Sequence, residues 1–433
     1  MRVFLGILLS GLIAFAVQAK DGERDYPTWY VVNHAEDETA TVATESKEAT
    51  ESPKEAVSVT EDMPDNKELR RKKMRLSKAR LAKKEQTQKG SRFAKNDKDL
   101  LLAERLLKII YEDNSLSNFV VSPVSFYAVS VLMANGVVDE TLFEFSSMFP
   151  VLHLAEVDSI FKAYIDSKKE SISVYNALWG AAFSEHYKTL MQEYLGAELW
   201  GIEDSTQIIN DWINTRTQGL LKNFAEPEKA VPEDVFASSG ALFKIKEAPF
   251  KTQNTSIRQF FNLDESVSNI KFLQGEVLAD YFENENMQVL RLTYATGDKL
   301  TLWLPNSDVD FDEFIDGIDL NLLNPDFEKQ EVKVLMPEMD VEYTIKDVAD
   351  VYELMGVKRI FEKENYDFAK MISFDNPTKV KNVFVGSRVM VTENLSDESK
   401  EELSAKISFE ADHPFMFMIN DGDFIGVYIS GKD

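Results

Sequence analysis

The stretch from Lys379 to Ile419 constrains the fold of this chain more than any other. From Lys379 onward, apolar residues alternate with other residues, which is the period-two pattern of a β-strand. A polar, charged run follows and ends at Phe409. A second strand pattern then places Phe415, Phe417 and Ile419 on one face. The stretch therefore predicts a long strand, an exposed connector and a returning strand near the C-terminus.

Residues 1–19 have the pattern of a secretory signal peptide. Arg2 precedes an apolar run from Val3 to Val17, and small residues stand at the expected cleavage position at Ala19. The run is shorter than the ~20 residues of a transmembrane helix, which favours a signal peptide over a membrane anchor. We therefore expect a protein that is secreted to the extracellular space and not held in a membrane.

Residues 20–98 are expected to form a disordered extension, acidic at first and then basic. Residues 67–98 contain fourteen lysines or arginines and only three acids. Block charge of this kind is typical of segments that cannot bury a core. The basic block suggests a heparin-like polyanion or the protein's own acidic body as partner, and the alternative is a solvated segment with no specific partner. The formal charge of −26 argues against a nucleic-acid partner for the whole chain.

Residues 99–433 have the patterning of one globular domain. Ser122 and Pro123 predict the start of a helix, with Ser122 as its N-cap, and a second helix is expected from Ile209 to a stop at Gly219. Segments across this range also match, in order, the motifs of one family. They are NFVVSPVS from Asn118, NALW from Asn176, INDWINTRTQGLL from Ile209, ALFKIKEAPF from Ala241, LTLWLPN from Leu300, the run 331–361, HPFMFMI from His413, and Gly431-Lys432.

These motifs identify the chain as resembling the serpin family of serine protease inhibitors. The resemblance implies an α+β fold with about nine helices around three β-sheets. It also implies that the connector before Phe409 is a reactive loop offered to a protease. In inhibitory members, cleavage lets this loop insert as a new central strand, which traps the protease.

The chain departs from the family where the central sheet opens. The resemblance places an Asn and a His there, bonded to each other, in the region that Ser122 and Ser125 underlie. This sequence has Ser239 and Val385 at those two positions, so we expect no such bond. The departure puts in doubt a sheet that is tuned to open and reclose.

The hinge of the loop departs further. The family has small residues there, whereas this chain has charged ones, and the hinge residues are Glu393, Asn394, Leu395, Ser396, Glu398, Lys400 and Glu402. One register of an inserted strand would bury Glu398, Lys400 and Glu402, and the other would bury Asp397 and Glu401. Each unpaired buried charge costs several kcal/mol, so we expect insertion to stall.

The loop is also shorter than is typical of inhibitory members. Leu403 and Ile407 lie four residues apart, as do Glu402 and Lys406, which predicts a short exposed helix. Lys406-Ile407 is the candidate cleaved bond. Asn254 and Asn394 stand in N-x-S/T sequons and are candidate glycosylation sites.

No pattern predicts an enzyme. The four histidines lack zinc-ligand spacing, there are no cysteines, and the segment from Asn420 to Asp423 is better explained as a hairpin turn than as a calcium loop. We expect a monomer without metal or cofactor. The favoured interpretation is a secreted serpin that does not inhibit by loop insertion. The alternative is a short-loop inhibitor of an atypical serine or cysteine protease.

Overall fold

The computed structural model describes most of the chain after Leu101. The described residues are 102–149, 153–166, 169–180, 182–202, 205–222, 224–226, 228–231, 234–245, 250, 253–320, 325–345, 348–362, 367–372, 378–392, 405–420 and 422–432. The expected signal peptide and the extension at 20–98 lie outside these residues. Within them, no helix has the length and apolar character that would let it cross a membrane.

Helices make up the first part of the described chain and recur between later strands. Among the described residues there are α3 (Leu102–Asn114), α4 (Pro123–Gly136), α5 (Asp139–Met148), α6 (Leu154–Asp166), α7 (Glu185–Thr189), α8 (Gln207–Arg216), α9 (Phe311–Gly317) and α10 (Val348–Leu354). A π-turn at Leu190–Tyr194 extends α7, and Arg359–Phe361 form one 3₁₀ turn.

The described strands form two hydrogen-bonded sheets. The five-stranded sheet has the order β10 (Met339–Thr344), β11 (Lys379–Val391), β4 (Asp234–Ile245), β2 (Ile172–Trp179) and β3 (Glu198–Trp200). The nine-stranded sheet has the order β1 (Phe119–Val121), β14 (Phe424–Tyr428), β13 (Phe415–Ile419), β8 (Lys299–Pro305), β7 (Met287–Thr293), β6 (Val267–Glu283), β9 (Glu328–Pro337) and β12 (Ile407–Glu410), with β5 (Gln253–Phe261) on β6.

The α+β fold class is confirmed, with two hydrogen-bonded sheets among the described residues where three were expected. Strand β6 is 17 residues long and pairs with β5 and β9 along one part and with β7 along the other. Because β6 pairs with all three of these strands, two sheets that the family resemblance counts separately are hydrogen-bonded into one here.

The centre of the five-stranded sheet is a parallel pair, β4 and β11. Their register runs from Lys379 beside Asp234 to Val391 beside Ile245, with one irregularity between Val380 and Asn382. We call the line of contact between these two strands the seam. The predicted long strand from Lys379 is thereby confirmed, and the seam is closed along its whole length.

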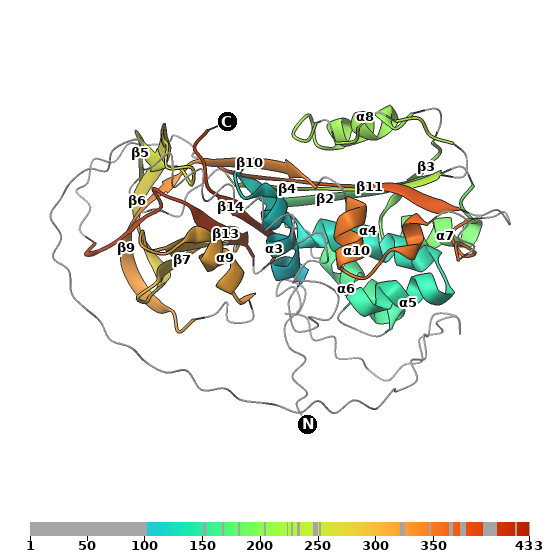
Figure 1. Ribbon diagram of the computed structural model, residues 1–433, viewed down its shortest axis with the longest axis horizontal. Coiled ribbons are helices and arrows are strands. Elements are labelled where there is room, and N and C mark those ends of the chain that lie inside the picture. The colour runs from blue at the N-terminus through green and yellow to red at the C-terminus, as the bar shows by residue number, and fades with distance from the viewer. Residues whose placement is uncertain are drawn as a thin grey trace, which may run out of the picture. The chain divides into compact units, whose positions relative to one another are not determined.

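Helices cover both faces of this sheet. Figure 1 shows α8 on one face, above β2, β4 and β11, and α4 and α10 on the other. Side chains of α8, including Ile209, Trp212 and Ile213, form a buried cluster with Trp179 and Phe236 of the sheet. Strands in this position are buried on both sides, which explains why eleven of the twelve residues of β4 are buried.

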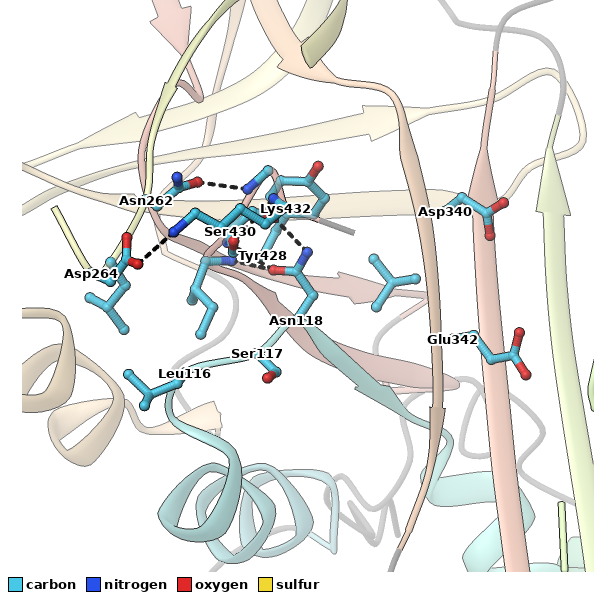
Figure 2. Close-up of a pocket in the computed structure, with 14 residues that line it drawn as sticks. Leu116, Ser117, Asn118, Asn262, Asp264, Asp340, Glu342, Tyr428, Ser430 and Lys432 are labelled. Atoms are coloured by element: carbon cyan, nitrogen blue, oxygen red, sulfur yellow. Dashed lines mark hydrogen bonds and ion pairs between the residues drawn. The ribbon is translucent and has the colours of Figure 1, made fainter. Parts of the chain in front are cut away.

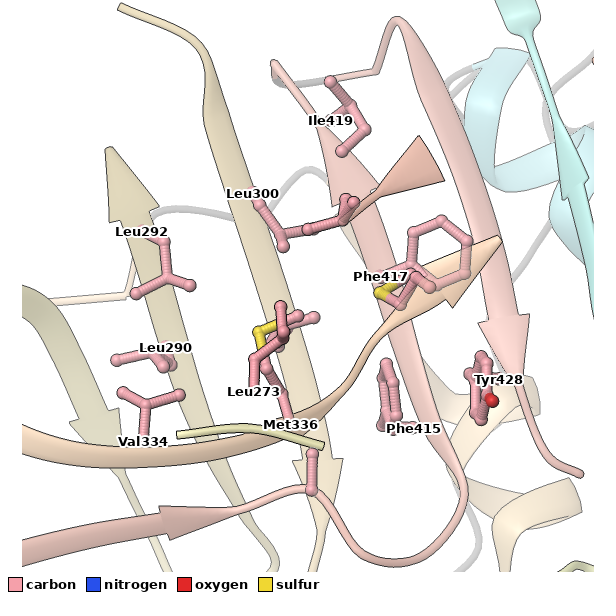
Figure 3. Packing of buried hydrophobic residues seen from close by; sticks show 14 of the residues in the cluster. Leu273, Leu290, Leu292, Leu300, Val334, Met336, Phe415, Phe417, Ile419 and Tyr428 are labelled. Carbon is pink, nitrogen blue, oxygen red and sulfur yellow. The ribbon is translucent and has the colours of Figure 1, made fainter. Parts of the chain in front are cut away.

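A second apolar core lies against the nine-stranded sheet and includes residues of both sheets. Figure 3 shows Phe415, Phe417 and Ile419 of β13 pointing into this core, toward side chains of neighbouring strands such as Leu300. All five residues of β13 are buried. The predicted apolar face of the returning strand is therefore confirmed.

Several local predictions are confirmed. Ser122 caps α4 by accepting a hydrogen bond from the Ser125 amide, and Pro123 is the first helical residue. Helix α8 ends at Arg216, and Gly219 follows with φ of +81°, as expected of a glycine stop. Asn420 and Gly422 also have positive φ and lie in the turn between β13 and β14.

The short helix predicted through Ile407 is wrong at its C-terminal end. Ile407 begins β12 and pairs with Val332 of β9, and its side chain packs against the core of the nine-stranded sheet. Burial in a sheet therefore outweighs the helical spacing of Leu403 and Ile407. Leu403 and Glu402 lie outside the described residues.

Candidate functional site

The candidate reactive loop connects the two sheets. It leaves the central sheet after β11, where the Thr392 amide still donates a 3.1 Å hydrogen bond to the Ile245 carbonyl. It enters the nine-stranded sheet at Ile407. The hinge residues Glu393, Asn394, Leu395, Ser396, Glu398, Lys400 and Glu402 lie outside the described residues, so their roles stay predictions.

The C-terminal end of the loop is fixed by two contacts. The Ala405 amide donates a 2.5 Å hydrogen bond to Oε1 of Glu276 on β6, and Ile407 joins the β9 ladder. Lys406 lies exposed between these anchors. Cleavage of the Lys406-Ile407 bond would require the first residue of β12 to leave its ladder, because proteases bind substrates in an extended, unpaired form. Lys406-Ile407 stays the candidate cleaved bond, but its cleavage requires Ile407 to unpair from β9 first.

His413 fixes the turn that follows β12. One ring nitrogen bonds to Oδ1 of Asp412 and the other bonds to the Pro305 carbonyl, both at 2.8 Å. Burial alone would lower the pKa of His413, but these two hydrogen bonds favour the charged ring and raise the pKa. The family-like His-Pro motif therefore positions the end of the loop segment.

The departure at Ser239 and Val385 has a defined geometry. The two residues are partners in the parallel register of β4 and β11. Val385 has no hydrogen-bonding side chain. The Ser239 hydroxyl turns to β2 instead and donates a 2.6 Å hydrogen bond to Oδ1 of Asn176. Both Ser239 and Asn176 are buried, so this polar pair ties β4 to β2 and not to β11.

Ser122 and Ser125 serve the start of α4. The Ser122 hydroxyl donates a 2.9 Å hydrogen bond to the Asp423 carbonyl, which links α4 to the turn between β13 and β14. Ser125 is fully buried, and its hydroxyl has no hydrogen-bond partner among the described residues. Within the described part of the chain, no hydrogen bond joins these serines to Ser239.

Two buried carboxylates meet at that turn. Asn420 donates 2.9 Å hydrogen bonds to both Asp298 and Asp423, and Lys169 lies 3.6 Å and 3.9 Å from them. Burial raises the pKa of Asp423 to about 6. Burial also acts on Asp298, but hydrogen bonds from Ser171 and neighbouring groups outweigh it and lower the pKa of Asp298. The site is a polar junction between the turn and the chain after α6.

A hollow of about 500 Å³ lies beside the C-terminal segment. Figure 2 shows Asn118 and Asn262 bonded to this segment and Lys432 paired with Asp264. The Asn118 side chain accepts hydrogen bonds from the amides of Ile429 and Ser430 at 2.7 Å and 2.9 Å. The hollow therefore surrounds an anchored chain end. Asn118, Asn262 and Asp264 are occupied by that anchoring, and Asp340 and Glu342, which also line the hollow, pair with Arg388.

Among the described residues, no group of three or more histidine or acidic side chains is arranged to hold a metal ion. Of the two sequons, Asn254 lies on β5, an edge strand that pairs with β6, and Asn394 lies outside the described residues. Glycan occupancy at both positions stays a prediction.

Sequence reasoning missed two features of the seam. Gly240 and Gly386 are register partners across it, and Arg388 projects from β11 to contacts far away in the chain. Two signals were present in the sequence. A glycine inside a strand often marks the close approach of another chain segment. Arg388 is the one charged residue in the run 383–391.

The comparisons with known proteins agree with this fold. The family model described as "Serpin (serine protease inhibitor)" matches residues 99–432. An "uncharacterized serpin-like protein" of Methanosarcina mazei is 23% identical over 356 residues, which cover 73% of this chain and 80% of the relative.

Two solved structures are similar at the level of the fold. Native protease nexin-1 with heparin has a TM-score of 0.68 at 17% identity, covering 78% of this chain and 98% of that one. Uncleaved ovalbumin has a TM-score of 0.67 at 18% identity, covering 76% and 97%. The chain belongs to the serpin family. Members of this family typically inhibit serine proteases, although some do not.

Proposed function

We propose that this protein is a secreted serpin that does not trap proteases by inserting its loop. The observation that carries the proposal is the burial of the seam. An inserted strand would lie between β4 and β11, and most residues of both strands are buried, on whichever face they lie. The inserted strand would therefore be buried on both faces in the middle of the sheet.

Burial on both faces strengthens the argument from the hinge. The loop carries charges at Asp397, Glu398, Lys400, Glu401 and Glu402. On a sheet with one solvated face, one register would leave some of these charges in water. Between β4 and β11, charges of both registers lose water, at several kcal/mol each. Each backbone hydrogen bond of the inserted strand would stabilise it by roughly 1 kcal/mol net. The free-energy cost of burying the charges is therefore larger than the free energy gained by insertion.

Chain length supports the same conclusion. Strand β4 has 12 residues, and a strand that fills the seam beside it needs a similar length after the turn. From Glu393 to Ala405, where Glu276 holds the chain, there are only 13 residues. Cleavage at the C-terminal end of this segment would free these residues only, and the turn out of β11 would use some of them. Too few residues would remain to form a strand as long as β4.

The proposal is tested by incubating the protein with a panel of serine and cysteine proteases. We expect cleavage of the loop without a complex that survives SDS. A matched variant with Leu395→Gly and threonine or alanine at 397–402 tests whether hinge chemistry is the cause. A covalent complex with the natural chain would refute the proposal.

The second candidate is a short-loop inhibitor. One observation favours it. Lys406 is exposed and lies between two anchored residues, so its side chain is available to the binding pocket of a protease. Tight, reversible inhibition of a lysine-selective protease, lost in Lys406→Ala, would support it. Unimpeded protease activity at excess protein would exclude it.

The expected secretion has further consequences. The signal-like residues 1–19 support export, and export would expose Asn254 and Asn394 to glycosylation. A polyanion partner for residues 67–98 is supported by their fourteen basic residues, and protease nexin-1 was solved with heparin. Mass spectrometry of secreted material, before and after glycosidase treatment, tests both the cleavage after Ala19 and the glycans.

A further inference from the structure

Strand β5 is an open edge of the nine-stranded sheet. On one side it pairs with β6, from Gln253 beside Gly275 to Phe261 beside Val267. No other strand of the described chain pairs with it. Figure 1 shows β5 at the margin of the molecule, next to β6. An edge strand of this kind presents a row of backbone donors and acceptors with which another strand can pair.

Hydrogen bonds at the hairpin end of β5 show which of its backbone groups point away from β6. The Asn262 amide donates across the hairpin to the Ser266 carbonyl at 2.8 Å. The Phe261 amide instead donates away from β6, to the Asp412 carbonyl, also at 2.8 Å. Inward and outward groups alternate along an antiparallel strand, so every second residue before Phe261 has its backbone groups on the outer side.

The outward positions that stay open are therefore Thr255, Ile257 and Gln259. Within the described part of the chain, the backbone groups of these residues bond to no segment on the outer side of β5. The open edge is bounded at one end by Phe261, because the amide of Phe261 is already bonded. The three open positions are symmetric about Ile257.

The side chains along this edge are apolar on one face. Ile257 and Phe261 lie four residues apart and thus share a face, and Val267 of β6 is the register partner of Phe261. These side chains are 69%, 48% and 48% exposed. Arg258 is the only charged residue of β5, and its guanidinium bonds to Ser256 and Gln274, both at 3.0 Å. The edge thus lacks the run of charges that usually protects an edge strand from pairing.

We propose that β5 pairs with β5 of a second copy of this chain, antiparallel, about a two-fold axis at Ile257. Ile257 then faces Ile257 of the second copy, and Thr255 faces Gln259. Each facing pair exchanges two backbone hydrogen bonds, because these residues are the outward ones. The same register places Arg258 opposite Ser256, so the one charge of the strand meets no like charge.

Symmetry is the reason to assign the partner as a second copy. The pairing uses the same three positions of both strands, and it joins the exposed apolar faces of the two hairpins into one surface across the axis. The contact is confined to one short strand, so we expect a weak, concentration-dependent dimer in place of the monomer expected from the sequence. The dimer does not depend on whether the loop inserts.

Sedimentation equilibrium tests the dimer, with protein produced without N-glycans because the Asn254 sequon lies on β5. Between about 1 and 100 µM we expect the average mass to rise toward twice that of the chain. Ile257→Lys should stay monomeric, since two lysines would face each other across the axis. The matched control is Leu278→Lys, because Leu278 is also exposed but pairs with Glu331 of β9, and it should dimerise like the natural chain.

A disulfide gives a sharper test, because the chain has no cysteine of its own. In Ile257→Cys the two Cα atoms would lie about 5.5 Å apart, within the reach of a disulfide. In Gln259→Cys each cysteine lies two residues from the axis, so the two Cα atoms would be roughly 14 Å apart and could not be bridged. Under mild oxidation we expect the covalent dimer to form faster in Ile257→Cys, by about tenfold or more.

Three results would overturn the proposal. They are a monomer at every concentration, a dimer of Ile257→Lys as abundant as that of the natural chain, and equal rates of disulfide formation at the two cysteine positions. If Ile257→Lys does not fold, Gln259→Pro removes an outward amide from the same edge and is subject to the same outcomes.

Discussion

Ser239 and Val385 lie side by side across the seam, yet the Ser239 hydroxyl bonds away from it, to Asn176 at 2.6 Å. At this level β4 is joined to β2 by side chains and to β11 by its backbone. Side chains of β11 make contacts at two other places. Lys381 pairs with Asp234 of β4 and with Glu228 of the chain after α8, and Arg388 donates to the Leu220 carbonyl of that chain. The buried polar pair of Ser239 and Asn176 therefore does not span the seam.

The first prediction concerns the buried pair itself. Ser239→Ala leaves the Asn176 carbonyl oxygen buried without its donor, so we expect a loss of about 1–2 kcal/mol in the free energy of unfolding. Urea denaturation measures this value. Ser159→Ala, which removes a half-buried hydroxyl bonded to its own helix, is the matched control and should cost less. Equal values for the two variants would contradict the account.

The second prediction concerns Gly386, the register partner of Gly240 across the seam. Gly386→Ala places a methyl group against Phe224, so we expect a loss of about 1–3 kcal/mol from overpacking. Phe224→Leu should recover part of this loss when combined with it, because the clash is with the ring. Gly317→Ala, where nothing lies within 4 Å, should have little effect in the same assay. Strictly additive costs for Gly386→Ala and Phe224→Leu would show that the two side chains do not interact.

The third prediction is a pH dependence from Asp423. Burial raises the pKa of Asp423 to about 6, above its value in the unfolded chain, so the folded protein holds this proton more tightly. Its contribution to the free energy of unfolding therefore falls as the pH rises from about 4 to 7, by about 3 kcal/mol in total. Asp423→Asn should flatten the profile of urea midpoint against pH in this range.

His413 acts in the same direction, because its raised pKa gives stability that is lost as the pH rises through that value. The difference between the natural chain and Asp423→Asn isolates the carboxyl group. Asp298→Asn is the opposite control, since the pKa of Asp298 is lowered and its contribution is lost as the pH falls. A profile for Asp423→Asn as steep as that of the natural chain would disprove this assignment.

The fourth prediction concerns the basic segment. We expect the chain to bind a heparin column and to elute earlier when the lysines and arginines of 67–98 are replaced by glutamine. The elution shift should shrink with added salt, because exposed charges are screened. Replacing the same number of basic residues within 99–432 is the control. Unchanged retention after neutralising 67–98 would rule this segment out as the polyanion site.

Much of the fold followed from local patterns. The period-two strand from Lys379, the Ser122 cap and the Gly219 stop depend on residues close in sequence, and each is present. Ile407 was misassigned because its helical spacing is local, whereas its pairing with Val332 is set by the second sheet. The Arg388 contact to Leu220 spans 168 residues, and no spacing rule connects two such positions.

The most direct test of the central claim is a melting curve before and after a single, complete nick within residues 397–408. If the loop cannot insert, cleavage adds no central strand, and we predict a melting temperature that is almost unchanged. Mass spectrometry confirms that the nick is complete. A rise of tens of degrees would mean that the cleaved loop fills the seam, and it would contradict the proposal that this serpin does not act by insertion.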